Sequence, residues 1–88
     1  ASVPLLMDDL SGAVASADAA AVGRRAHAVK TSFAIVGAVR AVACCEQLET
    51  AGRSNDLAAV PACVADLEQA WAGARRLLTS RMERGRAA

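Results

Sequence analysis

The amino-acid sequence predicts an all-α protein, an antiparallel up-down bundle of four helices. Alanine is the commonest residue, tyrosine is absent and the only aromatic residues are Phe33 and Trp71, a composition that favours helices over sheets. Four segments also carry apolar residues at every third or fourth position, which is the pattern of a helix with one buried face. Because 88 residues allow one modest hydrophobic core, we expect a single domain over residues 1–88.

The first helix is expected at residues 3–16. Pro4 is tolerated there because the amide groups of the first helical turn have no partner inside the helix. Gly12 weakens this helix. Its expected apolar side consists of Val3, Leu6, Met7, Leu10 and Val14.

The second helix is expected at residues 18–35, with Asp18 capping its free amide groups. Gly37 is the natural end of this helix, because glycine adopts the left-handed backbone conformation without steric cost. The expected buried face consists of Val22, Ala26, Val29, Phe33 and Val36.

The third helix is expected at residues 38–51 and is closed by Gly52. The polar turn that follows contains Asn55 and Asp56, either of which can cap a long fourth helix. The expected inward residues of the third helix are Ala41, Val42, Cys45 and Leu48.

The fourth helix is expected at residues 56–82, followed by a frayed tail. Pro61 would remove one hydrogen bond a few residues inside this helix, so we expect a disturbance at residues 57–61. The expected apolar stripe consists of Val60, Val64, Leu67, Trp71, Ala74 and Leu78.

The net charge and the cysteine content argue against several classes of protein. A net charge of +1 is too small to suggest binding to nucleic acid or to a membrane surface. Three cysteines, two of them adjacent, do not form a disulfide framework, which favours a reducing cytoplasm. The sequence also has no uncharged apolar run of about 18 residues, the length that spans a bilayer. Because the four apolar stripes can cover one another, we expect a monomer.

His27 is the only histidine of the chain and lies off the apolar face of the second helix. Lys30 and Thr31 follow it by about one turn on the same side, so the histidine belongs to a polar, cationic surface. An exposed imidazole is a nucleophile near neutral pH, because a large fraction of it is uncharged there. From spacing alone, an ordinary solvated histidine is the favoured interpretation.

Three motifs together resemble the histidine phosphotransfer (HPt) domain. The usual pattern of that family is Ala-His-x-Leu-Lys-Gly-Ser-Ser, then Gly-Ala, then Cys-x-x-Leu-Glu. The corresponding segments here are 26–33 (AHAVKTSF), 37–38 (GA) and 45–49 (CEQLE), and the resemblance extends from about residue 18 to residue 78. It implies a four-helix domain whose histidine accepts a phosphoryl group from an aspartyl phosphate on a receiver domain and passes it to another receiver.

The resemblance also implies roles for individual residues. His27 would be the phosphoacceptor, attacking through Nε2, and Lys30 would be the charge partner of the phosphoryl oxygens. Glu49 is a candidate acceptor of a hydrogen bond from Nδ1 of the histidine, although an ordinary surface salt bridge is an equal alternative.

The neighbouring positions are candidates for binding the receiver. Arg24 would steer an acidic partner or would simply be solvated, and Ala34 would belong to the docking surface. Thr31 departs from the usual glycine and fills part of the approach to the histidine. Phe33 replaces the second serine of the pattern and is interpreted as a core residue.

The resemblance implies no cofactor in the domain, because Mg²⁺ is supplied by the partner receiver. The expected partners are the receiver of the same kinase and that of a response regulator, with the domain at the C-terminal end of a hybrid sensor histidine kinase. The domain would not be an enzyme on its own, since it has no ATP site.

Three alternatives stay open at this point. The first is a helical docking module that binds receivers without transferring phosphate, and the second is the phosphoacceptor domain of a chemotaxis-type kinase. The third, a metal site formed by His27 with the cysteines, is disfavoured because Cys44 and Cys45 point about 100° apart on a helix.

Overall fold

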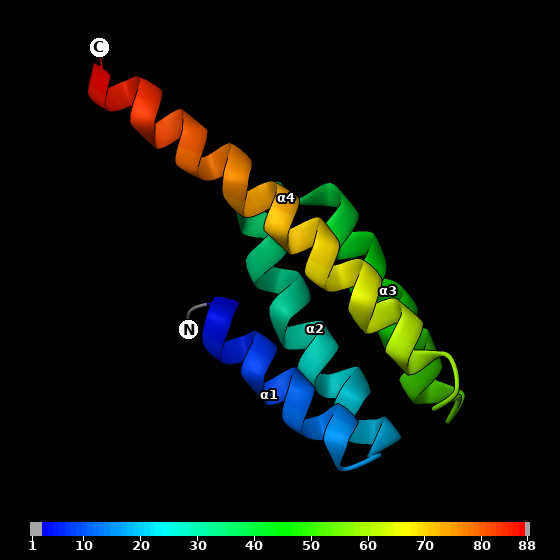
Figure 1. Cartoon of the computed structure of the whole chain (residues 1–88). Coiled ribbons are helices and arrows are strands. Elements are labelled where there is room, and N and C mark those ends of the chain that lie inside the picture. The colour runs from blue at the N-terminus through cyan, green and yellow to red at the C-terminus, as the bar shows by residue number, and fades with distance from the viewer. Residues whose placement is uncertain (1–2, 88) are drawn as a thin grey trace.

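Four helices form the bundle in a computed structural model that describes residues 3–87, with side chains described for residues 3–80. They are α1 (Val3–Ala15), α2 (Ala19–Ile35), α3 (Val39–Arg53) and α4 (Val60–Ala87). Consecutive helices run in opposite directions and are joined by short connections (Figure 1). The prediction of an all-α, up-down four-helix bundle is confirmed.

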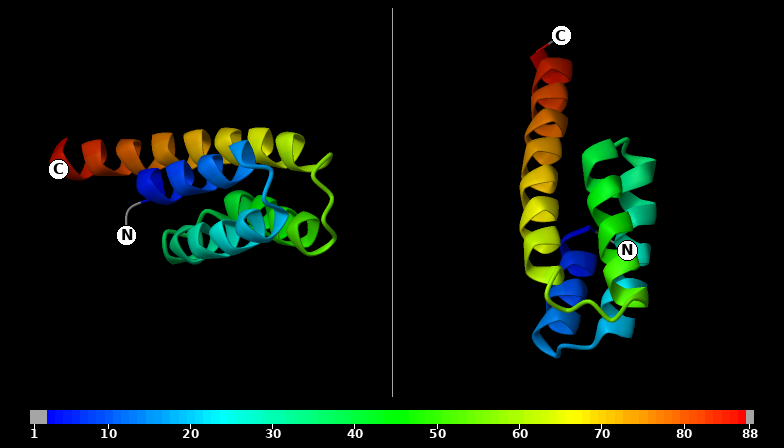
Figure 2. Two further views of the ribbon diagram at one scale, coloured as in Figure 1. Left: turned by 90° about the horizontal axis from the view of Figure 1, so that it is seen from below. Right: turned by 90° about the vertical axis from the view of Figure 1, so that its right-hand side faces the viewer.

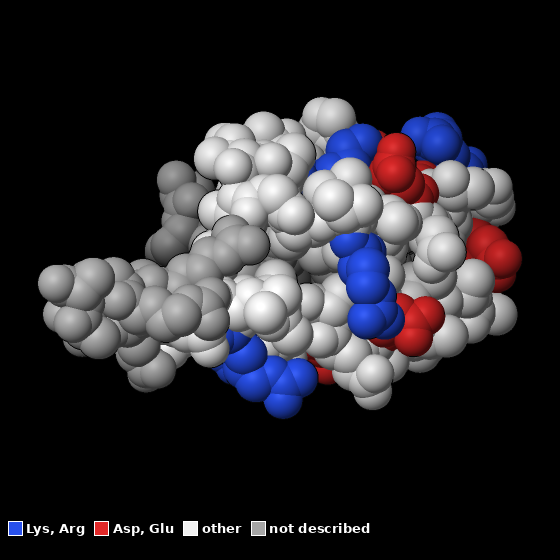
Figure 3. All heavy atoms as spheres, turned by 90° about the horizontal axis from the view of Figure 1, so that it is seen from above, with Lys and Arg blue, Asp and Glu red and all other residues white. Residues whose placement is uncertain are grey.

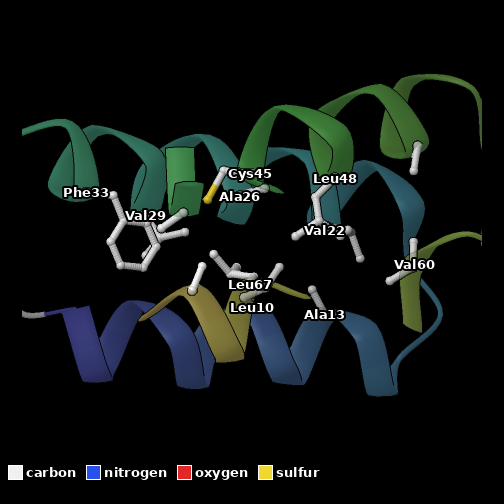
Figure 4. Packing of buried hydrophobic residues seen from close by; sticks show 13 residues of the cluster. Leu10, Ala13, Val22, Ala26, Val29, Phe33, Cys45, Leu48, Val60 and Leu67 are labelled. Carbon is white, nitrogen blue, oxygen red and sulfur yellow. The ribbon is translucent and has the colours of Figure 1, made fainter. Parts of the chain in front are cut away.

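The hydrophobic core lies between the four helices (Figure 4). The ring of Phe33 on α2 lies 5.4 Å from that of Trp71 on α4, centroid to centroid. Val36 was expected on the buried face and is 42% exposed, because α2 ends at Ile35 and the helical spacing no longer applies beyond it. The largest fully buried side chains come from all four helices and are Phe33, Leu10, Leu48, Leu67, Val22, Val29 and Cys45.

In each of the three connections the second residue adopts the left-handed conformation. Gly37 has φ +75°, Ala17 has φ +53° and Asn55 has φ +54°. In each case the next amide bonds back to a carbonyl five residues earlier, for example Ala38 N–H to Phe33 C=O at 3.0 Å. These bonds satisfy carbonyl groups that the helix end leaves without partners, so the chain reverses within a few residues.

The observed helix ends correct several expected ones. Asp18 precedes α2 as its N-cap and accepts a 3.1 Å hydrogen bond from the amide of Ala21. α3 continues through Gly52 to Arg53, so Gly52 does not close this helix. α1 ends at Ala15, one residue earlier than expected.

The start of α4 was predicted too early. Residues 57–59 form a turn, and the helix begins at Val60 rather than at residue 56. Pro61 therefore lies in the first turn, where no intrahelical partner exists for an amide proton and proline removes no bond. The disturbance expected at residues 57–61 is the turn of residues 57–59 that precedes the helix. At the other end the helix continues to Ala87, although it was expected to fray after residue 82.

α4 gives the molecule its elongated shape. Its 28 residues correspond to a length of about 42 Å, and its C-terminal part extends beyond the other three helices (Figure 2). The molecule measures 49 × 20 × 18 Å along its principal axes. Within the described part of the chain, no helix combines the length and the hydropathy needed to cross a membrane.

Candidate functional site

His27 lies near the middle of α2 with its side chain 66% exposed. Ala26 and Val29 beside it in the sequence are fully buried, so the helix is anchored in the core while the imidazole projects outward. The hydroxyl of Thr31 donates a 3.3 Å hydrogen bond to the backbone carbonyl of His27. The ring therefore stands on a helix that is packed against the core on its other side, rather than on a loop.

Glu49 of α3 reaches the histidine from the neighbouring helix. Its Oε2 atom lies 3.1 Å from Nδ1 of His27, and its side chain is only 14% exposed. The antiparallel course of α2 and α3 brings these residues together although 22 positions separate them in the sequence. The carboxylate is thus a nearly buried acceptor below an exposed ring.

The other oxygen of Glu49 is paired with Lys30. Nζ of Lys30 lies 2.6 Å from Oε1, and the lysine side chain is 24% exposed. Among the described residues, no directed hydrogen bond reaches Oε1, so this contact is an ion pair rather than an aligned hydrogen bond. One carboxylate of α3 therefore links two residues that are one turn apart on α2.

These contacts shift the pKa values of both charged partners. Burial by itself would raise the pKa of Glu49, but the contacts with Lys30 and His27 outweigh burial and lower this pKa below its ordinary 4.5. The contact with Glu49 raises the pKa of Lys30 above its ordinary 10.5. Glu49 therefore stabilises the fold above pH 4.5 and loses this contribution as the pH falls through its lowered pKa. Lys30 contributes below pH 10.5 and loses its contribution as the pH rises above that value.

The charge on Glu49 decides which nitrogen of His27 carries the proton. An ionised carboxylate only accepts hydrogen bonds, so the neutral imidazole must place its proton on Nδ1. Nε2 then keeps its lone pair. Because the ring is largely exposed, this nitrogen is the accessible nucleophile of the site.

A groove of about 670 Å³ runs between α2 and α3 beside the histidine. His27 and Glu49 line it together with Arg24 of α2 and Arg53 of α3, and both arginines are exposed. The remaining lining residues are small, namely Ala20, Gly23 and Gly52. The groove therefore offers an apolar floor between two cationic side chains.

The other candidate residues from the sequence lie elsewhere on α2. Thr31 and Ala34 are exposed beyond His27 and do not line the groove. Four lining residues were not predicted from the sequence, namely Ala20, Gly23, Gly52 and Arg53. Gly23 precedes His27 by four positions and so shares its side of the helix, which is the one available signal for it.

The cysteines are free thiols and lie away from the groove lining. Cys45 is buried in the core, and burial raises the pKa of its thiol to about 12. No cluster of three or more His, Cys, Asp or Glu side chains that could hold a metal ion occurs among the described residues. Figure 3 shows basic and acidic side chains close to one another on one face of the molecule.

Comparison with known proteins identifies one family. The family model described as the Hpt domain matches residues 1–83. No curated protein and no solved structure matches the chain significantly.

Proposed function

Since the chain belongs to the Hpt domain family, whose members transfer phosphoryl groups on a histidine in phosphorelays, we propose that His27 is the phosphoacceptor. The observation that carries this proposal is that the chain contains a single histidine, and that its ring is exposed with Nδ1 held by a carboxylate. The domain accepts the phosphoryl group from an aspartyl phosphate of one receiver and passes it to the receiver of a response regulator.

The geometry supports an in-line attack by Nε2. Its lone pair forms the nitrogen–phosphorus bond while the bond between phosphorus and the aspartyl oxygen breaks, and the aspartate leaves as a carboxylate. The ring keeps its proton on Nδ1 and becomes positively charged during this step. Glu49 lies next to that proton and offsets the charge, so the same contact that exposes Nε2 also stabilises the product.

Lys30 has two roles in the proposed mechanism. In the unphosphorylated domain it neutralises Glu49 through the 2.6 Å ion pair. On phosphorylation its ammonium group, one turn from His27, lies on the side of the helix where the phosphoryl oxygens arrive and serves as their charge partner. Arg24 attracts the acidic rim of the receiver, and Thr31 and Ala34 belong to the surface that the receiver covers.

The receiver supplies the other groups that the transfer reaction needs. Mg²⁺ and the acidic residues that bind it belong to the receiver, and the domain has no part in ATP chemistry. We place the domain in a hybrid sensor kinase, with the receiver of that kinase as donor. The free thiols favour a cytoplasmic site of action for a monomeric domain.

Transfer from a phosphorylated receiver tests the proposal. The receiver is labelled on its aspartate, mixed with the domain, and the label is followed on both proteins. We expect acid-labile, base-stable label on the domain as the receiver loses its own. Receivers that bind the domain but keep their phosphate would instead support the docking module, and direct labelling by a separate kinase domain with ATP would support the chemotaxis-type alternative.

The charge of Glu49 makes a separate prediction. Glu49→Gln keeps an acceptor near Nδ1 but removes the negative charge, and we expect transfer to slow by about 10-fold to 100-fold, the effect seen for carboxylates that orient metal-binding imidazoles. The variant should also lose the pH dependence of stability that Glu49 contributes below pH 4.5.

Glu46→Gln is the matched control for this variant. It removes the same charge from the exposed side of α3, one turn earlier, and transfer should change by less than about twofold because exposed charges are strongly screened. Equal rates for the two variants would show that Glu49 does not act on His27.

A further inference from the structure

Two glycines meet where α2 and α3 cross. Gly23 lies four residues before His27 on α2, and Gly52 lies three residues after Glu49 on α3. Residues three or four positions apart share one side of a helix, so this crossing is one turn away from the contact between His27 and Glu49. The backbones of the two helices therefore come into close contact next to the site.

The contact at Gly52 leaves no room for a side chain. A Cβ atom there would lie 2.8 Å from the carbonyl oxygen of Ala19 and 2.9 Å from both Cα and N of Gly23. These are backbone atoms, which cannot rotate away as a flexible side chain can. Any residue other than glycine at position 52 must therefore move α3 relative to α2.

The opposite glycine is under no such constraint. A Cβ atom on Gly23 would lie 3.8 Å from Cα of Gly52 and 3.9 Å from the carbonyl oxygen of Glu49, which are ordinary van der Waals distances. One contact thus contains an intolerant and a tolerant glycine. This asymmetry provides a control from within the same crossing.

We infer that Gly52 is a positioning residue, which sets the spacing of α2 and α3 that holds the carboxylate of Glu49 within hydrogen-bond distance of Nδ1 of His27. Its consequence for phosphotransfer rests on the function proposed above, but its consequence for the histidine does not. Both α2 partners of Glu49, His27 and Lys30, depend on the same spacing.

The distances show why a methyl group matters. Relieving the contact requires the 2.8 Å approach to open to at least 3.4 Å, where ordinary contact begins. The bond from Nδ1 to Oε2 is already 3.1 Å long, and an opening of that size would take it beyond the 3.5 Å limit of a hydrogen bond. His27 would then lose the partner that keeps its proton on Nδ1.

The proton on Nδ1 can be observed directly by ¹⁵N NMR of the imidazole in the free domain near pH 8. We expect the wild type and Gly23→Ala to show one tautomer, with the proton on Nδ1. Gly52→Ala should show a mixture in which Nε2–H, the form that free histidine prefers, is well populated. A wild-type spectrum from a folded Gly52→Ala domain would overturn the inference.

A second variant decides the matter if Gly52→Ala does not fold. Gly23→Val adds two methyl groups beyond the tolerated Cβ, and we expect them to open the crossing from the α2 side. Loss of the Nδ1 proton in folded Gly23→Val supports the inference, and retention of that proton overturns it.

Transfer kinetics then relate the inference to function. Gly52→Ala should transfer about 10-fold or more slowly, while Gly12→Ala, whose Cβ has nothing within 4 Å on α1, should match the wild type. A tautomer change in Gly52→Ala without any transfer by the wild type would uphold the positioning role and refute the proposed relay. If Gly52→Ala changed the tautomer of His27 but left the transfer rate unchanged, the spacing set by Gly52 would have no importance for transfer.

Discussion

His27→Gln is expected to abolish phosphotransfer completely. His27 is the only histidine of the chain, and the amide that replaces it has no nucleophilic nitrogen at neutral pH. The substitution should leave the fold intact, because the side chain is 66% exposed and contributes nothing to the core. The expected result is wild-type receiver binding with label at background level.

Two controls make this result specific. The unfolding free energy of His27→Gln should lie within about 0.5 kcal/mol of the wild type, as for other surface substitutions. Acid treatment should remove the label from the wild type, because a phosphoramidate is labile in acid and a phosphoserine is not. Label retained by the variant would show that another residue accepts the phosphoryl group.

Phe33→Ala is expected to cause the largest loss of stability, about 3–5 kcal/mol. The ring is fully buried and packs against Trp71 at 5.4 Å, so its removal leaves a cavity between α2 and α4. A domain of this size has a total stability of only about 5–10 kcal/mol. Urea unfolding should therefore show a much lower midpoint.

Ile35→Ala is the matched control for this prediction. Ile35 lies two residues further along α2 and is 80% exposed, so its truncation should change stability by less than about 0.5 kcal/mol. A loss below about 1 kcal/mol for Phe33→Ala would mean that the Phe33 ring is not packed in the core as the structure shows.

The sequence predicted the helices and their buried faces because both depend on local spacing. Phe33, Leu48 and Leu67 were assigned to the core from periods of three and four, and all three are fully buried. Helix ends were less predictable. Arg53 and Val60 became boundaries through the left-handed turn at Asn55 and the position of Pro61, which periodicity does not report.

The site was predictable only in part. The helical pattern placed His27 on a polar face, whereas Glu49 became a candidate through the family resemblance. The pairing of Lys30 with Glu49 depends on the distance between two helices, which no local pattern contains. The same holds for Gly52, which was interpreted as a helix end and instead lies against the backbone of Ala19 and Gly23 on α2.

The central claim is that Glu49 holds Nδ1 of His27 and leaves Nε2 to react. The most direct measurement is ³¹P and ¹⁵N NMR of the domain after phosphorylation by a labelled receiver, with ¹⁵N in the imidazole ring. Coupling between phosphorus and the two nitrogens identifies the atom that carries the phosphoryl group. We predict phosphorus on Nε2 with Glu49 still bonded to the proton on Nδ1. Phosphorus on Nδ1, or no phosphohistidine at all, would contradict the account.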